Sequence, residues 1–388
     1  MTIDRDLTLD TLRELIRIDS RNPALETGAP GERELAAFVG RHLADIGWEA
    51  ELYDLGERRA NVVAVQHGAG GGPSLMINVH LDTVGVGGMT APFRPRTADG
   101  RIDGRGAQDT KGGLAAVLAA GRLLAEAGPA LAGDVVLAFV ADEEHESLGT
   151  SELLRHVRTD AAIVIEPTDL DVCVAHRGFG VYRLTTRGRA AHGGDAEAGV
   201  DANLHMGRVL AALDRLREEW SRTHRHPLLH PAGLHVPRMS GGRQLFRYAD
   251  ECAIDLECRT VPGQTADGVL AELKAILADV AGRTEDFEGR VEPLMWRGPY
   301  ELDPDRPIVR TVRVAAGRVR GERVELIGHP WWEDAGLLGE AGIDAVVLGP
   351  RGGGLHTDEE WVDTDSVIQL AEILYDSLTS YCGRALDS

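Results

Sequence analysis

Two histidines and several carboxylates of this chain lie just beyond short apolar runs. The runs cover residues 75–79, 135–140, 161–165 and 345–348, and the polar residues that follow them are His80, Asp82, Glu143, Glu144, Glu166 and His356. Imidazole and carboxylate side chains without thiolates are ligands that zinc, cobalt and manganese accept in proteins. These residue types therefore predict a metal site and the chemistry of a metallohydrolase.

The apolar runs must bring these side chains together. Short runs rich in Val, Ile and Leu predict buried strands of a parallel sheet. Ligands of such sheets collect in the crevice outside the carboxyl ends of the strands. Because each polar residue follows a run, the sequence predicts that they converge at one edge of the sheet.

Several of these residues also have a purely structural interpretation. Residues two apart on a strand point the same way, so Asp82 can accept the second N–H of His80, although histidine–aspartate neighbours are common on protein surfaces. Asp109 lies just before a helix and fits an N-cap. His356 fits an ordinary loop histidine. None of these motifs identifies a metal site alone.

The acidic residues 142–144 and Glu166 carry more information. An acidic run is usually a solvated loop, but a metallohydrolase needs one carboxylate on the metal and another that takes a proton from water. Glu143 and Glu144 can divide these tasks, because the chain turns between them. Glu166 ends a buried strand, where a carboxylate is costly to desolvate without a cation.

Composition and charge narrow the class of protein. The 388 residues suggest two or three domains, and the net charge of −21 argues against a nucleic-acid or anionic-membrane partner. The N-terminal residues lack the apolar core of a secretory signal, and no apolar stretch is long enough to span a membrane. None of the four cysteines forms a Cys-x-x-Cys pair, so we expect reduced thiols and a cytoplasmic location.

The order of apolar patterns predicts an α/β fold with an insertion. Strands alternating with helices at both ends of the chain predict a three-layer sandwich with a mostly parallel sheet. Between them, residues 178–187 and 252–259 alternate apolar and polar side chains, with helical patterns nearby. We expect a catalytic metal-binding domain over residues 1–175 and 294–388, interrupted by a smaller, lid-like α+β domain over residues 176–293.

Five ordered motifs resemble one family of enzymes over nearly the whole chain. They are NVHLDTV, GRGAQDTKGG, ADEEHESLGT, IEPT and GGGLHTDEE. The family comprises the co-catalytic zinc aminoacylases, acetylornithine deacetylases, succinyl-diaminopimelate desuccinylases and glutamate carboxypeptidases, which are metallopeptidase-type amidohydrolases. The resemblance implies two divalent metal ions, with zinc preferred and cobalt or manganese as alternatives. Two such ions about 3.5–4 Å apart lower the pKa of bound water toward ~7 and polarise an amide carbonyl.

The resemblance also implies a role for each motif residue. Asp82 would orient a metal-binding histidine, and Glu143 would be the general base and later the acid. The metal ligands would be His80 and Glu166 on the first metal, Glu144 and His356 on the second, and Asp109 as the bridge between them.

Two residues of the insertion resemble substrate-binding residues of the family. His192, in RGRAAHGGDAEAGVDAN, would reach the active site of a partner subunit in a homodimer formed through the inserted domain, and donate a hydrogen bond to the developing oxyanion. Arg259, at the end of DLECR, would hold a substrate carboxylate through its guanidinium. A loop histidine and a solvated strand-end arginine are the structural alternatives.

The chain departs from the family pattern at two places. Phe246 lies where related deacetylases carry an asparagine four residues after a Gly-Gly pair, so substrate contacts made by the insertion are expected to differ. In the segment WWEDA, which begins at Trp331, the family often has Thr-Asp-Ala or Thr-Glu-Ala. Trp331 and Trp332 could line an apolar acyl pocket or belong to core or interface packing.

Together these observations predict a metal-dependent amidohydrolase that removes the acyl group of an N-acyl amino acid or a related N-acylated amine. A dipeptidase or carboxypeptidase is the alternative on the same scaffold. A non-catalytic, metal-binding dimeric scaffold is the alternative from another class, although all five ligand positions and the base are filled.

Overall fold

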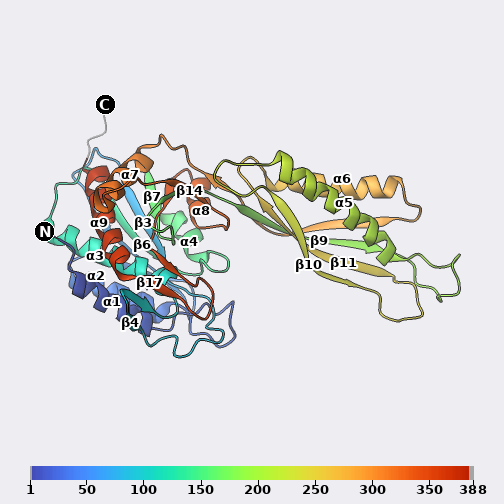
Figure 1. Ribbon diagram of the computed structural model, residues 1–388, viewed down its shortest axis with the longest axis horizontal. Helices are drawn as coiled ribbons and strands as arrows, with labels where there is room; N and C mark the ends of the chain where they lie inside the picture. Colours follow the sequence, from blue (N-terminus) through green and yellow to red (C-terminus); the bar gives the residue numbers. More distant parts are fainter. Residues whose placement is uncertain (1, 384–388) are drawn as a thin grey trace. The chain divides into compact units, whose positions relative to one another are not determined.

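In the computed structural model, which describes residues 2–383, the chain is divided between two units (Figure 1). Unit 1 comprises Met1–Val174, Leu302–Ile327 and Glu333–Ser388, and unit 2 comprises Ala175–Glu301 and Gly328–Trp332. Unit 2 is thus inserted into unit 1. The side chains predicted to bind metal all belong to unit 1, on segments before and after the insertion.

Unit 1 is built on a mixed sheet with the strand order β1-β2-β6-β3-β7-β15-β8. Its four central strands are parallel to one another, whereas β1, β2 and β8 pair antiparallel with their neighbours. Strands β3, β6 and β7 are buried along their whole length, which explains their uninterrupted apolar sequences. The bounds are β1 (Ala50–Asp54), β2 (Ala60–Gln66), β3 (Leu75–His80), β6 (Val135–Val140), β7 (Ala161–Val164), β8 (Val172–His176) and β15 (Asp344–Val347).

Helices cover both faces of this sheet, which gives the three layers (Figure 1). One layer holds α1 (Arg5–Arg17), α2 (Arg33–Asp45), α3 (Gly112–Ala127), α7 (Pro307–Arg320) and α9 (Thr364–Cys382), and the other holds α4 (Leu148–His156) and α8 (Ala335–Glu340). Helix α3 is buried along most of its surface because its small residues allow close packing. At Gly121, for example, the indole of Trp48 donates a hydrogen bond to the helix backbone.

A second, small sheet in unit 1 joins two loops that are far apart in the sequence. Its strand order is β16-β17-β5-β4, and all its pairings are antiparallel. The strands are β4 (Arg96–Ala98), β5 (Arg101–Asp103), β16 (Gly352–Gly353) and β17 (Trp361–Asp363), and the helical turn η1 (Ala107–Lys111) follows β5. The pairing of β5 with β17 holds the Asp109 segment near the loop that carries His356.

Unit 2 consists of an antiparallel sheet, in the order β10-β11-β9-β12, and two long helices. Apolar side chains of the sheet and helices, such as Tyr182, Leu184 and Trp220, form one buried core. The elements are β9 (Gly178–Arg187), α5 (Ala202–Thr223), β10 (Gly233–Gly241), β11 (Glu251–Thr260), α6 (Ala266–Gly282) and β12 (Glu288–Arg297). Two short strands, β13 (Tyr300–Glu301) and β14 (Leu326–His329), lie where the chain passes between the units.

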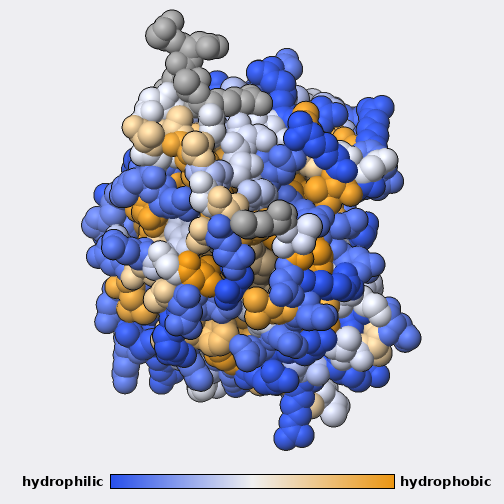
Figure 2. Space-filling view, turned by 90° about the vertical axis from the view of Figure 1, so that its left-hand side faces the viewer, coloured by the Kyte–Doolittle hydropathy of each residue, from blue (hydrophilic) through white to orange (hydrophobic). Residues whose placement is uncertain are grey.

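Hydrophilic side chains cover most of the face seen in Figure 2, and apolar residues appear there in small separate groups. Within residues 2–383, no helix combines the length and the apolar character needed to cross a membrane.

Candidate active site

The predicted metal-binding side chains meet at the carboxyl edge of the parallel strands. His80 is the last residue of β3, Glu143 and Glu144 follow β6, and Glu166 follows β7. Strands β3, β6 and β7 are parallel neighbours, so these three ends lie side by side.

Asp109 lies between the two histidines. Its Oδ1 is 2.9 Å from Nε2 of His80, and its Oδ2 is 3.2 Å from Nε2 of His356. On the two sides of this carboxylate, Nε2 of His80 is 3.4 Å from Oε1 of Glu166, and Nε2 of His356 is 3.2 Å from Oε2 of Glu144. Asp109 therefore connects two ligand groups, each with one imidazole and one further carboxylate.

The chemistry of this cluster fits divalent cations. Ligand atoms of His80, Asp109 and Glu144 lie within 4.8 Å of one another, as do those of His80, Glu143 and Glu166. The Oε1 atoms of Glu144 and Glu166 are buried and accept no hydrogen bond. Because a buried carboxylate oxygen that accepts no hydrogen bond is costly, these oxygens fit the ligands of a divalent cation.

The carboxylates of the cluster raise the pKa of its two histidines. Burial lowers the pKa of His80, but the carboxylates of Glu166, Asp109 and Asp82 outweigh it and raise that pKa well above its usual value. Hydrogen bonds to Asp109 and Glu144 raise the pKa of His356 to about 10. Burial alone would raise the pKa of Asp109, but hydrogen bonds and charge attraction from His356 and His80 lower it. Protonated imidazoles thus neutralise part of the carboxylate charge when no metal is bound.

Glu143 stands out among the carboxylates by its environment. Burial raises its pKa well above the usual value, and the neighbouring carboxylates of Asp334, Glu144 and Asp82 act in the same direction, against the charge of His80. A glutamate with a raised pKa can hold a proton near neutral pH. This is the property that a group accepting a proton from water and returning it later must have.

Asp82 connects two of the site segments. The Nδ1 atom of His80 donates a hydrogen bond to the backbone oxygen of Asp82 at 2.9 Å, while the Asp82 carboxylate lies 3.6 Å from the same atom. That carboxylate accepts hydrogen bonds from the backbone N–H groups of Glu143 and Glu144, at 3.0 and 3.1 Å, and from Asn22 Nδ2 at 2.8 Å. Asp82 therefore holds the turn after β6 against the end of β3, besides contacting His80.

A buried polar network that we did not predict from the sequence supports this turn. Asn22 Nδ2 also donates to Oδ1 of Asp142 at 2.9 Å. Arg59 Nη1 lies 2.7 Å from that oxygen and 2.9 Å from Oε1 of Glu32. Its Nη2 donates to Oδ1 of Asn22 at 2.8 Å. Asn22 and Arg59 precede the motifs by many residues, and only their contacts identify them.

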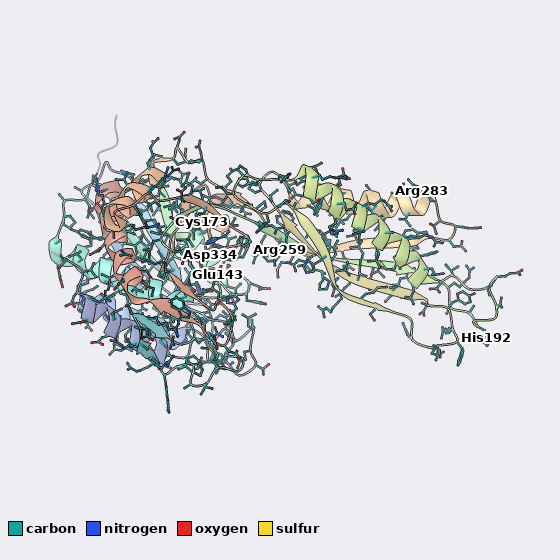
Figure 3. The ribbon with its side chains drawn as sticks, in the orientation of Figure 1. Glu143, Cys173, His192, Arg259, Arg283 and Asp334 are labelled. Atoms are coloured by element: carbon teal, nitrogen blue, oxygen red, sulfur yellow. The ribbon has the colours of Figure 1, made fainter. Side chains whose placement is uncertain are left out.

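The substrate-binding residues predicted in the insertion lie at opposite ends of unit 2 (Figure 3). His192 is exposed on a loop whose backbone pairs with Arg247. The Arg259 guanidinium lies 5.4 Å from the centre of the Phe179 ring, and its Nε is 2.5 Å from Oε1 of Glu257. The structure therefore does not bring His192 and Arg259 of one chain together.

Three residues at the departures from the family pattern, Phe246, Trp331 and Trp332, also lie in unit 2. Phe246 is 76% exposed, and its backbone oxygen accepts a hydrogen bond from the N–H of Gly193, next to His192. The ring centroids of Trp331 and His329 are 4.6 Å apart. The Arg297 guanidinium is 5.3 Å from the ring centre of Trp332. Both tryptophans thus contact cationic or imidazole side chains of their own unit.

A cluster of imidazoles and carboxylates at the carboxyl edge of an α/β sheet is the kind of site in which metal-dependent hydrolases hold their ions. The chain belongs to the peptidase family M20/M25/M40, whose pattern it matches over residues 76–380. Members of this family are metallopeptidase-type amidohydrolases, which act on amide bonds.

Curated relatives match the chain over almost its full length. An N-formyl-4-amino-5-aminomethyl-2-methylpyrimidine deformylase of Bacillus subtilis is 28% identical, covering 96% of this chain and 95% of the relative. An acetylornithine deacetylase of Myxococcus xanthus is 28% identical, covering 96% and 97%. An N-acetyl-L-citrulline deacetylase of Xanthomonas campestris is 28% identical, covering 92% and 93%.

Solved structures share the fold at lower sequence identity. The aminopeptidase PepT of Bacillus cereus superimposes with a TM-score of 0.82 at 20% identity, over 97% of this chain and 98% of that one. A dinuclear metal-binding M20 peptidase of Bacillus subtilis superimposes with a TM-score of 0.75 at 15% identity, over 98% and 99%. These likenesses establish the α/β fold with a smaller second unit.

Proposed function

We propose that this protein is a deacylase that hydrolyses the amide bond of an N-acyl amino acid or a related N-acylated amine. The observation that carries the proposal is the Asp109 carboxylate, which contacts both histidines of the cluster at 2.9 and 3.2 Å. The named activities of the three curated relatives, which are deacetylations and a deformylation, favour acyl removal over peptide cleavage.

Two divalent metal ions, preferably zinc, would be held by this cluster. The first would be bound by His80 and Glu166, the second by Glu144 and His356, and both by Asp109. When bound, such a pair lowers the pKa of water and polarises the amide carbonyl.

Glu143 would perform the proton transfers. Its carboxylate accepts a proton from the water that attacks the carbonyl carbon, and then gives that proton to the amide nitrogen as the C–N bond breaks. The products are a carboxylic acid and a free amine. The buried surroundings of Glu143 and its raised pKa support this assignment.

Unit 2 would serve as lid and dimerisation domain, and unit 1 as catalytic domain. His192 would donate a hydrogen bond to the substrate oxygen in the active site of the partner subunit, and Arg259 would bind a substrate carboxylate. The exposed loop that carries His192 supports the first role. We also propose a cytoplasmic location, since the four cysteines are buried thiols.

A panel of substrates tests the proposed function. Metal-reconstituted protein should hydrolyse at least one of N-acetylornithine, N-acetylcitrulline and an N-formylated aminomethylpyrimidine far faster than simple dipeptides. Preferential hydrolysis of dipeptides would favour a peptidase. Two bound metal ions without hydrolysis of any amide in a wide panel would favour a non-catalytic scaffold.

A further inference from the structure

Glu360 is a buried carboxylate of unit 1 that receives four hydrogen bonds. Its side chain is 1% exposed, and Arg105 Nη1 donates to Oε2 at 2.7 Å. The backbone N–H of Gly106 donates to the same oxygen at 2.8 Å, and those of Gln108 and Asp109 donate to Oε1 at 3.0 and 3.1 Å. The carboxylate therefore binds the backbone of the segment that ends in Asp109.

This segment cannot hold its shape by regular helical hydrogen bonds. Gly106 has a φ of +77°, and the backbone angles of Asp109 and Thr110 depart from helical values inside η1. Three buried or half-buried N–H groups are consequently left for another acceptor, and a buried donor without one is costly. Glu360 supplies the acceptor from a part of the chain about 250 residues away.

The same group also anchors the loop of His356. Arg105 donates through Nη2 to the backbone oxygen of Thr357 at 2.9 Å, next to His356. The N–H of Gly104 donates to the backbone oxygen of Glu360 at 3.1 Å. The two loops that carry Asp109 and His356 are thus joined by one buried ion pair and its backbone contacts.

We infer that Glu360 is a positioning residue, which with Arg105 orients Asp109 and His356 for the second metal ion. The inference rests on the two-metal site of the proposed function. His80 and Glu166 follow strands β3 and β7 and do not depend on this ion pair. Asp109 would bind both ions, whereas His356 would bind only the second. Loss of Glu360 should therefore weaken both metal sites, and the second more than the first.

The substitution Glu360→Gln tests this inference with little change of shape. The new amide places its NH2 group opposite two N–H donors. An NH2 group cannot accept their hydrogen bonds, so these donors lose their acceptor. We expect the second metal ion to bind about 10- to 100-fold more weakly, as for other residues that support metal ligands, and the first to lose clearly less affinity. Elemental analysis after dialysis against increasing concentrations of chelator measures how tightly the two ions are bound. The absorption spectrum of the cobalt-substituted protein measures the same loss directly.

Glu359→Gln is the matched control, because Glu359 is adjacent in sequence but exposed. It should keep both metal ions with wild-type affinity. If Glu360→Gln folds and keeps both ions as tightly, or loses both to the same extent, the positioning role is wrong. If the wild-type protein binds no metal in the same dialysis, the proposed function itself fails.

Arg105→Lys provides a second variant if Glu360→Gln does not fold. It keeps the positive charge next to Glu360 but cannot bridge Glu360 and the Thr357 oxygen with two nitrogens of one planar group. We expect the same preferential weakening of the second metal ion. Equal affinities at both sites, as in the wild type, would contradict the inference.

Discussion

At the scale of single residues, Glu143 is the side chain on which the proposed chemistry depends most directly. Glu143→Gln keeps the shape of the side chain but removes the group that accepts the proton from water. We expect kcat to fall by at least about 10²- to 10⁴-fold, because this is the usual contribution of a general base. Steady-state kinetics and elemental analysis measure the two relevant quantities, turnover and metal content.

Metal content should remain near that of the wild type, since Glu143 is not among the five proposed ligands. Glu146→Gln is the control, because Glu146 is exposed on the same turn. It should leave kcat nearly unchanged. Wild-type turnover in Glu143→Gln would remove Glu143 from the mechanism.

His356 predicts a pH dependence for the metal-free protein. Contacts with Asp109 and Glu144 raise its folded-state pKa to about 10, above the usual value of about 6.5. The protonated form therefore stabilises the fold, and this contribution is complete below about pH 6.5 and is lost as the pH rises toward 10. Chelated protein should show a falling urea midpoint between pH 7 and pH 10.

In metal-loaded protein this fall should be smaller, because the cation replaces the proton as the partner of the carboxylates. His356→Gln should also reduce the fall in chelated protein. His67→Gln is the control, since His67 contacts Asp134 in an exposed ion pair outside the cluster. An unchanged pH dependence in chelated His356→Gln would show that another group is responsible.

At the scale of secondary-structure elements, the turn after β6 depends on partners from distant segments. Arg59 is the cation between the buried carboxylates of Glu32 and Asp142. The substitution Arg59→Met leaves both carboxylates without this cation. Breaking a buried ion pair in this way costs about 3–5 kcal/mol of stability. Urea denaturation of the metal-free protein measures the loss.

The neighbouring Arg58→Met is the matched control, because Arg58 is exposed and donates to a backbone oxygen, that of Ala29, rather than to a buried carboxylate. Its free energy of unfolding should stay within about 0.5 kcal/mol of the wild type. A loss of the same size in both variants would mean that the Arg59 network does not stabilise the fold specifically.

At the scale of the whole molecule, the proposed homodimer makes a complementation test possible. If His192 acts in the active site of the partner subunit, His192→Ala and Glu143→Gln homodimers should both have low activity. A heterodimer of these two chains contains one site with both an intact Glu143 and an intact partner His192. Random pairing of equal amounts of the two chains makes about half of the dimers heterodimers, and each of these has one active site of two. Co-expression should therefore restore about a quarter of wild-type activity.

Sedimentation of the same samples reports the oligomeric state. Recovery of activity in the mixture requires both a dimer and a role for His192 across it. If the mixture is no more active than the two separate variants, or if the active wild type sediments as a monomer, the proposed role of His192 across a dimer is wrong.

Part of the site followed from local sequence patterns. His80 and Glu166 follow runs of apolar residues, and such runs form buried strands whose ends face one edge of the sheet. The small sheet that joins β5 to β17 was not predicted, because its strands are only two or three residues long. So short a segment carries no recognisable periodicity.

The sequence by itself determined that buried parallel strands end in imidazoles and carboxylates, because apolar periodicity is a property of neighbouring residues along the chain. The family resemblance already implied that Asp109 lies between the two metal sites. Only the tertiary structure decided that Asp82 holds the turn of Glu143 and that Glu360 binds the Asp109 segment. A hydrogen bond requires two groups to meet within about 3 Å. Which loops come that close depends on the packing of the whole unit.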